Sequence, residues 1–158
     1  PTQSDTVYLE NGDGDDLYNR TRPGRFMHLG SGHDYSVGVL VDEGGDDTYA
    51  IAGLGAGASN CNGVGLFVDN AGDDTYLASS DYGSGMGNVS GECLQTRPLA
   101  DSLGVMIDAG GTDSYTYPES DYPVPGDGKT WGHIRNGLDS EKGAGVDGTG
   151  ETGVHPGG

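Results

Sequence analysis

Apolar and polar residues alternate in four short segments of the chain, and each segment ends in a similar acidic turn. The segments align as VYLENGDGDDLY (7–18), GVLVDEGGDDTY (38–49), GLFVDNAGDDTY (65–76) and GVMIDAGGTDSY (104–115). Alternation with a period of two is typical of a β-strand, and Gly-Asp clusters are typical of turns. Each repeat is therefore predicted to form a strand, an acidic turn and a closing tyrosine, and no segment shows a helical period.

The alternation also predicts which side of each strand is buried. One set of alternate positions is aliphatic and comprises Val37, Val39, Val41, Val64, Leu66, Val68, Leu103, Val105 and Ile107. The other set carries glycine, a larger apolar residue and aspartate, as in Gly65, Phe67 and Asp69. We expect the aliphatic set to face the core and the aspartates to lie at the outer edge.

Equivalent positions carry equivalent residues, which predicts that the strands stack in register. A chain that lays one strand on the previous one in every repeat forms a parallel β-solenoid, in which neighbouring repeats complete a thin core. The expected fold is therefore all-β: a β-helix or β-roll-like solenoid of about four irregular coils. The solenoid is assigned to residues 1–122, and residues 123–158 are expected to form a Gly/Pro/Asp-rich extended tail.

Charge narrows the choice of partners. The 158 residues include 7 Lys and Arg against 25 Asp and Glu, a net charge of −18. Such a chain cannot neutralise nucleic-acid phosphates, and it has no apolar run near the roughly 20 residues that span a bilayer. Small cations are the expected counter-charge.

In-register stacking would place aspartates in columns, one with Asp42, Asp69 and Asp108 and another with Asp47, Asp74 and Asp113. Neighbours about 4.8 Å apart repel by roughly 0.9 kcal/mol in water and about 3.5 kcal/mol at an effective dielectric near 20. A calcium ion between the carboxylates would replace this repulsion by attraction, because calcium accepts six to eight oxygen ligands in flexible geometry. The alternative is that these aspartates only cap turns through Asx-type hydrogen bonds.

The first repeat adds oxygen-bearing residues at alternate positions, much as the start of an EF-hand loop does, although the later ligand positions do not match. The candidate calcium ligands are Asn11, Asp13, Asp15, Asp16, Asp42, Asp46, Asp47, Asp69, Asp73, Asp74, Asp108 and Asp113. For the first aspartates of the GDDTY strings, Asp46 and Asp73, the sequence leaves open whether they face the metal or water.

The string GDDTY, at 45–49 and again at 72–76, resembles the second half of the RTX nonapeptide G-G-x-G-x-D-x-U-x. The resemblance implies that Asp16, Asp47, Asp74 and Asp113 bind calcium between rungs, although tandem nonapeptides are absent. A closer resemblance, over roughly residues 5–120, is to bacterial secreted proteins with long repeats of the form GVGLxVDxxGDDxY. That resemblance implies a secreted solenoid.

Other features suggest export. The chain begins at Pro1 without an initiator Met, so we expect a processed, extracellular or cell-surface protein. Cys61 and Cys93 are the two cysteines and could form one disulfide. The sequons at Asn19 and Asn88 permit N-glycosylation.

Catalysis is not expected, because a catalytic carboxylate pair should be unique, whereas these pairs repeat. The sequence favours a structural role, in a homo-oligomer or an extracellular assembly such as a filament or surface layer. The alternative is a carbohydrate-active or carbohydrate-binding β-helix, either lyase- or hydrolase-like or an adhesin module, with a polysaccharide partner.

Overall fold

The structure is a computed structural model that describes residues 6–9, 12, 14–18, 28–79, 84–88, 102–118, 125–132 and 141–149. These residues form β-strands, turns and bends and contain no helix. The strands are β1 (Thr6–Leu9), β2 (Leu17–Tyr18), β3 (Gly32–His33), β4 (Val37–Asp42), β5 (Thr48–Ile51), β6 (Ser59–Asn60), β7 (Val64–Asp69), β8 (Thr75–Ala78), β9 (Gly87–Asn88), β10 (Ser102–Gly111), β11 (Ser114–Thr116), β12 (Thr130–Gly132) and β13 (Glu141–Thr149).

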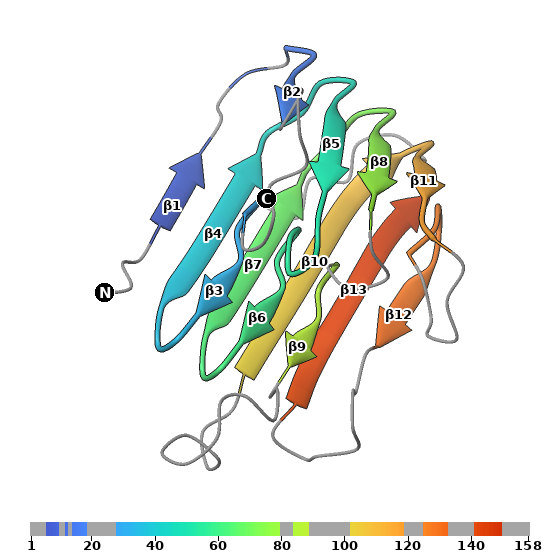
Figure 1. Ribbon diagram of the computed structural model, residues 1–158. Helices are drawn as coiled ribbons and strands as arrows, with labels where there is room; N and C mark the ends of the chain where they lie inside the picture. The colour runs from blue at the N-terminus through green and yellow to red at the C-terminus, as the bar shows by residue number, and fades with distance from the viewer. Residues whose placement is uncertain are drawn as a thin grey trace, which may run out of the picture.

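The strands form three sheets, shown in Figure 1. The six-stranded sheet has the order β1-β4-β7-β10-β13-β12, the four-stranded sheet β11-β8-β5-β2 and the three-stranded sheet β3-β6-β9. All described pairings are parallel except that of β12 with β13. The prediction of an all-β chain with parallel strands is confirmed.

Equivalent residues of successive repeats pair with one another. In the central strands Gly38 pairs with Gly65 and Asp42 with Asp69, and β7 pairs with β10 in the same register. The turns between β4 and β5 and between β7 and β8 bring the tyrosines of the four-stranded sheet into register as well, Tyr49 against Tyr76. In-register stacking is therefore confirmed for the described strands.

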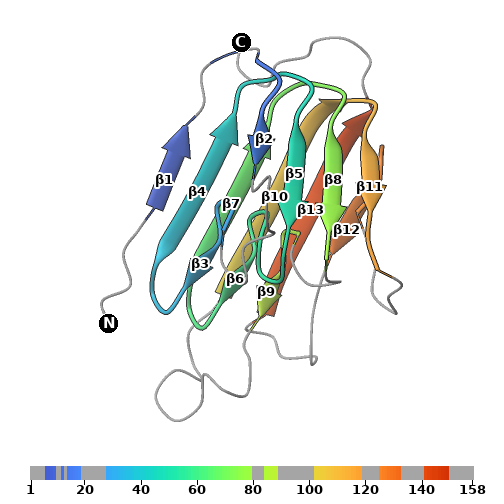
Figure 2. The same cartoon turned by 45° about the horizontal axis from the view of Figure 1, so that its top comes forward.

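The predicted orientation of the strands was wrong. Phe67 is 0% exposed, whereas Val64 and Leu103 are 36% and 42% exposed. The glycine, large apolar and aspartate positions face inward, and the aliphatic positions face outward. Both smaller sheets lie on the same side of the six-stranded sheet, which is the inward side (Figure 2).

Close approach of the sheets explains this orientation. A Cβ added to Gly65 would collide with the carbonyl oxygen of Ala58, just before β6, and one added to Gly38 would collide with that of Ser31. The backbones of the two sheets meet there, so only glycine fits on the inward side. The opposite side of each strand, which carries the valines, is also apolar. A valine side chain would not fit at the inward glycine positions, however, so that side cannot face the smaller sheets.

Beyond the glycines, the interior is filled by aromatic rings. Tyr18, Tyr49, Tyr76 and Tyr115 form a parallel stack with centroid separations of 4.8, 5.1 and 4.5 Å. Phe67 packs edge-on against Tyr49 at 5.0 Å. The stack turns the tyrosine of each repeat into part of one continuous core, with its hydroxyl groups directed at the aspartates.

Part of the predicted tail continues the six-stranded sheet. Strand β13 pairs with β10 so that Asp147 lies in register with Asp108, and β12 then adds in the antiparallel direction. The division into a domain of residues 1–122 and a tail of residues 123–158 stays a prediction.

Candidate metal centre

The equivalent aspartates Asp42 and Asp69, which end β4 and β7, and Asp108, within β10, are buried. Asp69 is 0% exposed; its Oδ1 accepts the amide hydrogen of Ala71 at 3.3 Å, and its Oδ2 accepts the Tyr49 hydroxyl at 2.6 Å. Asp42 and Asp108 make the same turn contact, 3.2 Å from the amides of Gly44 and Gly110. Each of the three aspartates therefore makes an Asx-type contact with the amide two residues on and keeps its carboxylate inside the molecule.

The second aspartate of each GDD turn is also buried, and these residues are linked by a ladder of hydrogen bonds. The amide of Asp47 donates to Oδ1 of Asp74 at 2.7 Å, and the amide of Asp74 donates to Oδ1 of Asp113 at 2.7 Å. The ladder begins at the amide of Asp16, which donates to Oδ1 of Asp47 at 2.5 Å. We call Asp47, Asp74 and Asp113 the inner column.

The two kinds of buried aspartate meet in groups of three. Asp47, Asp69 and Asp74 form one group, and Asp74, Asp108 and Asp113 form the other. Within each group one carboxylate oxygen from each residue lies within 4.8 Å of the others. Either group could hold a metal ion, and Asp74 belongs to both.

Asp74 stands out within the groups. It is 1% exposed, and its Oδ2 has no hydrogen-bond partner in the part of the chain that the structure describes. Its Oδ1 is already bound to the Asp47 amide. Asp74 thus combines membership of both groups with a buried, unsatisfied carboxylate oxygen, which costs free energy unless a proton or a cation compensates it.

The surroundings disfavour ionisation. Burial raises the pKa of Asp69 to about 9, and the neighbouring carboxylate of Asp74 adds to the effect. Burial likewise raises the pKa of Asp74 to about 7 and that of Asp47 to about 6. Both values are also raised by neighbouring aspartates and lowered by the ladder hydrogen bonds. At neutral pH these carboxylates are therefore fully ionised only if a bound cation supplies compensating positive charge.

The tyrosine hydroxyl groups cannot supply that charge. Tyr49 lies 2.9 Å from Oδ2 of Asp42, 2.6 Å from Oδ2 of Asp69 and 3.3 Å from Oδ2 of Asp47. Its hydroxyl has only one proton for these acceptors. Burial and the carboxylate of Asp69 raise the pKa of Tyr49 far above its ordinary value, so the hydroxyl stays neutral.

The first aspartates of the turns behave differently. Asp15, Asp46 and Asp73 are exposed, and they accept backbone amides of the following repeat. The amide of Asp73, for example, donates to Oδ1 of Asp46 at 2.9 Å. This outer column of Asp15, Asp46 and Asp73 is not part of either group of three. Asp46 and Asp73 thus lie on the solvent side of the turn.

The remaining predicted sites are only partly described. Asp16 is exposed and contributes its amide rather than its carboxylate to the ladder. Asn11, Asp13, Asn19 and Cys93 lie outside the described residues. The backbone of Asn88 belongs to β9.

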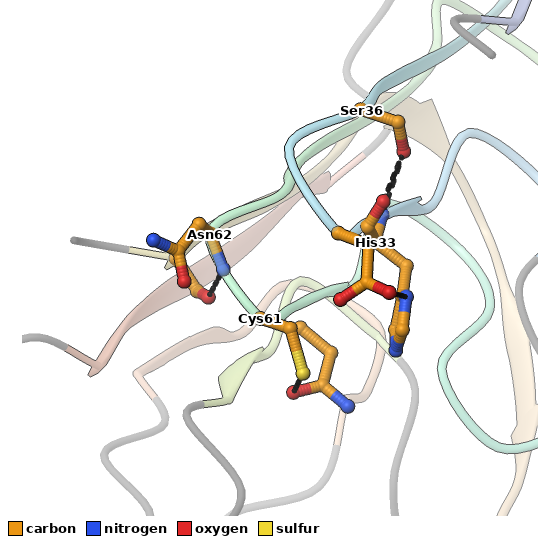
Figure 3. Close-up of polar contacts among 7 residues, drawn as sticks. His33, Ser36, Cys61 and Asn62 are labelled. Atoms are coloured by element: carbon orange, nitrogen blue, oxygen red, sulfur yellow. Dashed lines mark hydrogen bonds and ion pairs between the residues drawn. The ribbon is translucent and has the colours of Figure 1, made fainter. Parts of the chain in front are cut away.

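In a third group, His33, Asp34 and Cys61, one ligand atom from each residue also lies within 4.8 Å of the others. Cys61 is disulfide-bonded, so its sulfur is not available as a thiolate ligand. Figure 3 shows these residues at the corner before β7, where the Cys61 sulfur lies 3.2 Å from Oδ1 of Asn60 and His33 bonds Ser36. This corner is therefore not a metal centre.

Sequence reasoning missed two aspartates. Asp147 extends the row of Asp108 through the backbone register, and Oδ1 of Asp127 accepts the Asp113 amide at 3.3 Å at the end of the ladder. The string GAGVD at 143–147 parallels GVMID at 104–108 and could have indicated the first. Nothing in the local sequence around Asp127 distinguishes it from an ordinary turn residue.

Comparison with known proteins gives no assignment: no family model matches the chain, and no significant match was found among curated proteins or solved structures. A search of the described residues for a helix long and apolar enough to cross a membrane also found none.

Proposed function

We propose that this chain is an extracellular, calcium-binding structural protein, built as a parallel β-solenoid whose acidic turns bind Ca²⁺ between repeats. One observation carries the proposal. Asp74 belongs to both groups of three carboxylates and has a buried, unsatisfied Oδ2, so its carboxylate would act as a ligand shared by two ions.

A cation accounts for this arrangement better than protons alone. Each group contains three carboxylates, and those of Asp47, Asp69 and Asp74 accept hydrogen bonds from backbone amides and from one tyrosine hydroxyl. Protons compensate the group only in part at pH 7, because the pKa of Asp69 is raised to about 9 but those of Asp74 and Asp47 only to about 7 and about 6. A divalent ion in each group would compensate the negative charge of its three carboxylates, and Asp74 would be the ligand that the two ions share.

Calcium fits the ligands better than other common cations. All the ligand atoms are oxygens, which disfavours zinc and copper. Two oxygens bound to one Ca²⁺ at 2.3–2.6 Å can lie up to about 5 Å apart, which accommodates the spread of 4.8 Å. Magnesium demands a near-ideal octahedron that three carboxylates on a fixed backbone do not favour.

Other observations support the extracellular location and the structural role. The parallel, in-register strands agree with a solenoid, and the disulfide at Cys61 fits an oxidising compartment. Every buried aspartate of the groups recurs in the next repeat, so no pair is set apart for catalysis. A structural role in an extracellular assembly follows more readily than an enzymatic one.

The test is calcium removal and return, followed by circular dichroism during thermal unfolding and by metal analysis. We expect the chelated protein to melt at lower temperature and calcium to restore it. Each ion would add about 2.7 kcal/mol at a hundredfold excess over its dissociation constant. Asp74→Asn keeps the oxygen that accepts the Asp47 amide but removes the shared charge, so it should abolish most of the response.

Asp73→Asn is the matched control, because Asp73 is the adjacent residue of the same turn and lies in the outer column. It should retain the full calcium response. Unchanged melting after chelation, with no bound metal, would sink the proposal. If calcium stabilised the two variants equally, the ion would not be bound by Asp74.

A further inference from the structure

The turns that follow β3 and β6 bring three different kinds of metal ligand to one corner of the stack. His33 of β3 pairs with Asn60 of β6, and Asp34 and Cys61 come next in the chain, so they occupy equivalent places in adjacent turns. Figure 3 shows His33 and Cys61 on these neighbouring turns. An imidazole, a carboxylate and a sulfur therefore meet here, and we call His33, Asp34 and Cys61 the corner group.

Hydrogen bonds hold the backbone of both turns in place. The amides of Asp34 and Gly63 both donate to the carbonyl oxygen of Asn60, at 3.3 and 3.1 Å, which ties one turn to the next. The carbonyl oxygen of His33 accepts the amide of Ser36 at 3.2 Å and its hydroxyl at 2.6 Å. The side chains of the corner group thus project from a backbone that is already ordered, as a preorganised set of ligands requires.

Two members of the corner group have a backbone conformation that residues other than glycine rarely adopt. The φ angle is +55° at Asp34 and +50° at Cys61. Such values cost free energy and cluster at ligand-binding sites and switches. Turn chemistry alone would be satisfied by glycine or asparagine at both places. The disulfide explains the cysteine, but it does not explain the histidine and the aspartate beside it.

The distances in the corner group match the coordination sphere of zinc. Nδ1 of His33 lies 3.4 Å from Oδ2 of Asp34. Nitrogen and oxygen ligands about 2.0–2.1 Å from a tetrahedral zinc ion lie roughly 3.3–3.4 Å apart, and a zinc-bound sulfur lies roughly 3.5 Å from each. One ligand atom from each residue of the group is within 4.8 Å of the others, so rotation of a free Cys61 side chain can bring its sulfur into range.

We propose that reduction of the disulfide converts the corner group into a zinc site, with His33, Asp34 and the Cys61 thiolate as its protein ligands. While the disulfide is closed, the sulfur is not a ligand. A sulfur and an imidazole favour zinc over calcium, and three protein ligands leave the fourth tetrahedral position to water. The site shares no residue with the two groups of aspartates and goes beyond the calcium-binding function.

Opening the site is a two-electron step. A dithiol reductant attacks the disulfide, the S–S bond breaks, both cysteine sulfurs end as thiols, and the reductant leaves as a cyclic disulfide after giving up its two protons. Zinc then replaces the proton of the Cys61 thiol, which passes to solvent. The side chains of His33 and Asp34 are 18% and 22% exposed, so the ion can reach the site from solvent.

The experiment is a titration of the Cys93→Ser chain with Co²⁺ under nitrogen and in excess calcium, followed by zinc. The chain has two cysteines, so this variant leaves Cys61 no other cysteine of the chain to pair with. We expect a sulfur-to-cobalt charge-transfer band and the visible bands of a tetrahedral ion, both lost when zinc displaces cobalt. Cobalt bound by carboxylates alone gives no sulfur band, so failure here is distinguishable from failure of the calcium proposal.

Cys61→Ser is the matched control, because it also keeps one cysteine but removes the sulfur from the corner. It should show no charge-transfer band. In the Cys93→Ser background, His33→Gln and Asp34→Asn should each weaken zinc binding at least about tenfold. Asp73→Asn, in the outer column, should leave zinc binding unchanged.

The wild-type protein, reduced with a dithiol and desalted under nitrogen, provides a second measurement. It should give the same band, and the oxidised protein should give none. Absence of the band from both the variant and the reduced wild type would overturn the proposal, as would equal bands in Cys93→Ser and Cys61→Ser. Circular dichroism in excess calcium follows the fold of each sample. Loss of the fold in both the variant and the reduced wild type would also overturn it, because the site needs both turns in place.

Discussion

The first and third repeats contain the same three residues in the turn, Gly14-Asp15-Asp16 and Gly72-Asp73-Asp74, yet the two turns differ in burial and packing. Asp74 is 1% exposed, whereas Asp16 is exposed. A Cβ on Gly72 would collide with the carbonyl oxygen of Gly45, whereas one on Gly14 would meet no atom within 4 Å. The motif therefore acquires its chemistry from its neighbours in the stack.

The same contrast holds for the core. Tyr8 of β1 pairs with Leu40 and so occupies an inward position, yet it is 48% exposed, while Leu40 is 4% exposed. A repeat buries its large apolar residue and its aspartates only when repeats on both sides cover it. A copy of GDD in a sequence is thus a candidate ligand only in the interior of a stack.

The largest effect should come from Gly72→Ala. The residue has φ of +149°, and its Cβ position is occupied by the backbone of the previous turn. We expect a loss of more than about 3 kcal/mol in the free energy of unfolding, because both strain and a backbone collision must be relieved. Urea denaturation measures it.

Gly14→Ala is the control for this variant, because the site is open, and it should change stability by less than about 0.5 kcal/mol. Similar losses in the two variants would show that the first turn is packed as tightly as the third.

The pH dependence of the metal-free protein should show the next largest effect. Asp47, Asp74 and Asp69 have pKa values raised to about 6, about 7 and about 9 in the folded state, against 3.8 ordinarily. Between about pH 4 and pH 9 the unfolded chain releases these protons first. Stability should therefore fall as pH rises through that window.

Thermal melting in the presence of chelator, at several pH values, measures this slope. Asp69→Asn should flatten it, because the amide does not ionise, whereas Asp16→Asn in the first turn should leave it unchanged. A metal-free protein that grows more stable from pH 4 to pH 8 would contradict the burial of ionisable carboxylates in the interior.

The smallest effect should come from the tyrosine hydroxyl groups. Tyr49→Phe keeps the stacked ring but removes hydrogen bonds to Asp42 and Asp69, at a cost of about 1–2 kcal/mol. Tyr18→Phe, at the end of the stack, removes the single 2.5 Å bond to Asp42 in a partly buried place and should cost about 1 kcal/mol or less. Chemical denaturation of both variants at one calcium concentration measures the difference, and equal losses would contradict it.

The repeat spacing was enough to predict much of the fold. Because Asp42, Asp69 and Asp108 follow equivalent strands, stacking in register could be expected from the sequence, and the register of the strands confirms it. The two columns of aspartates could be predicted in the same way, but their burial could not, because the aspartates were expected at the outer edge. Their grouping around Asp74 could not, because it depends on how far the turn folds back onto the strand end.

The inward face was assigned wrongly for a physical reason. Alternation distinguishes two faces but does not say which is buried when both are apolar, as they are in Gly65-Leu66-Phe67. Here the distance between the sheets decides: glycine lets the backbones approach, and the aromatic and aspartate positions fill the wider part. Hydrophobicity alone predicts that the valine side is buried, because it takes no account of the distance between the sheets.

The antiparallel strand β12 has a consequence for how such a chain can grow. It occupies the last edge of the six-stranded sheet, in a direction that a further parallel repeat could not follow. Lengthening at that end is blocked, but a 27-residue block, the spacing of Asp47 and Asp74, can be duplicated between existing interior repeats. Each block inserted by gene duplication or by protein design would add one more shared carboxylate to the interior. Both ends of the stack would be unchanged.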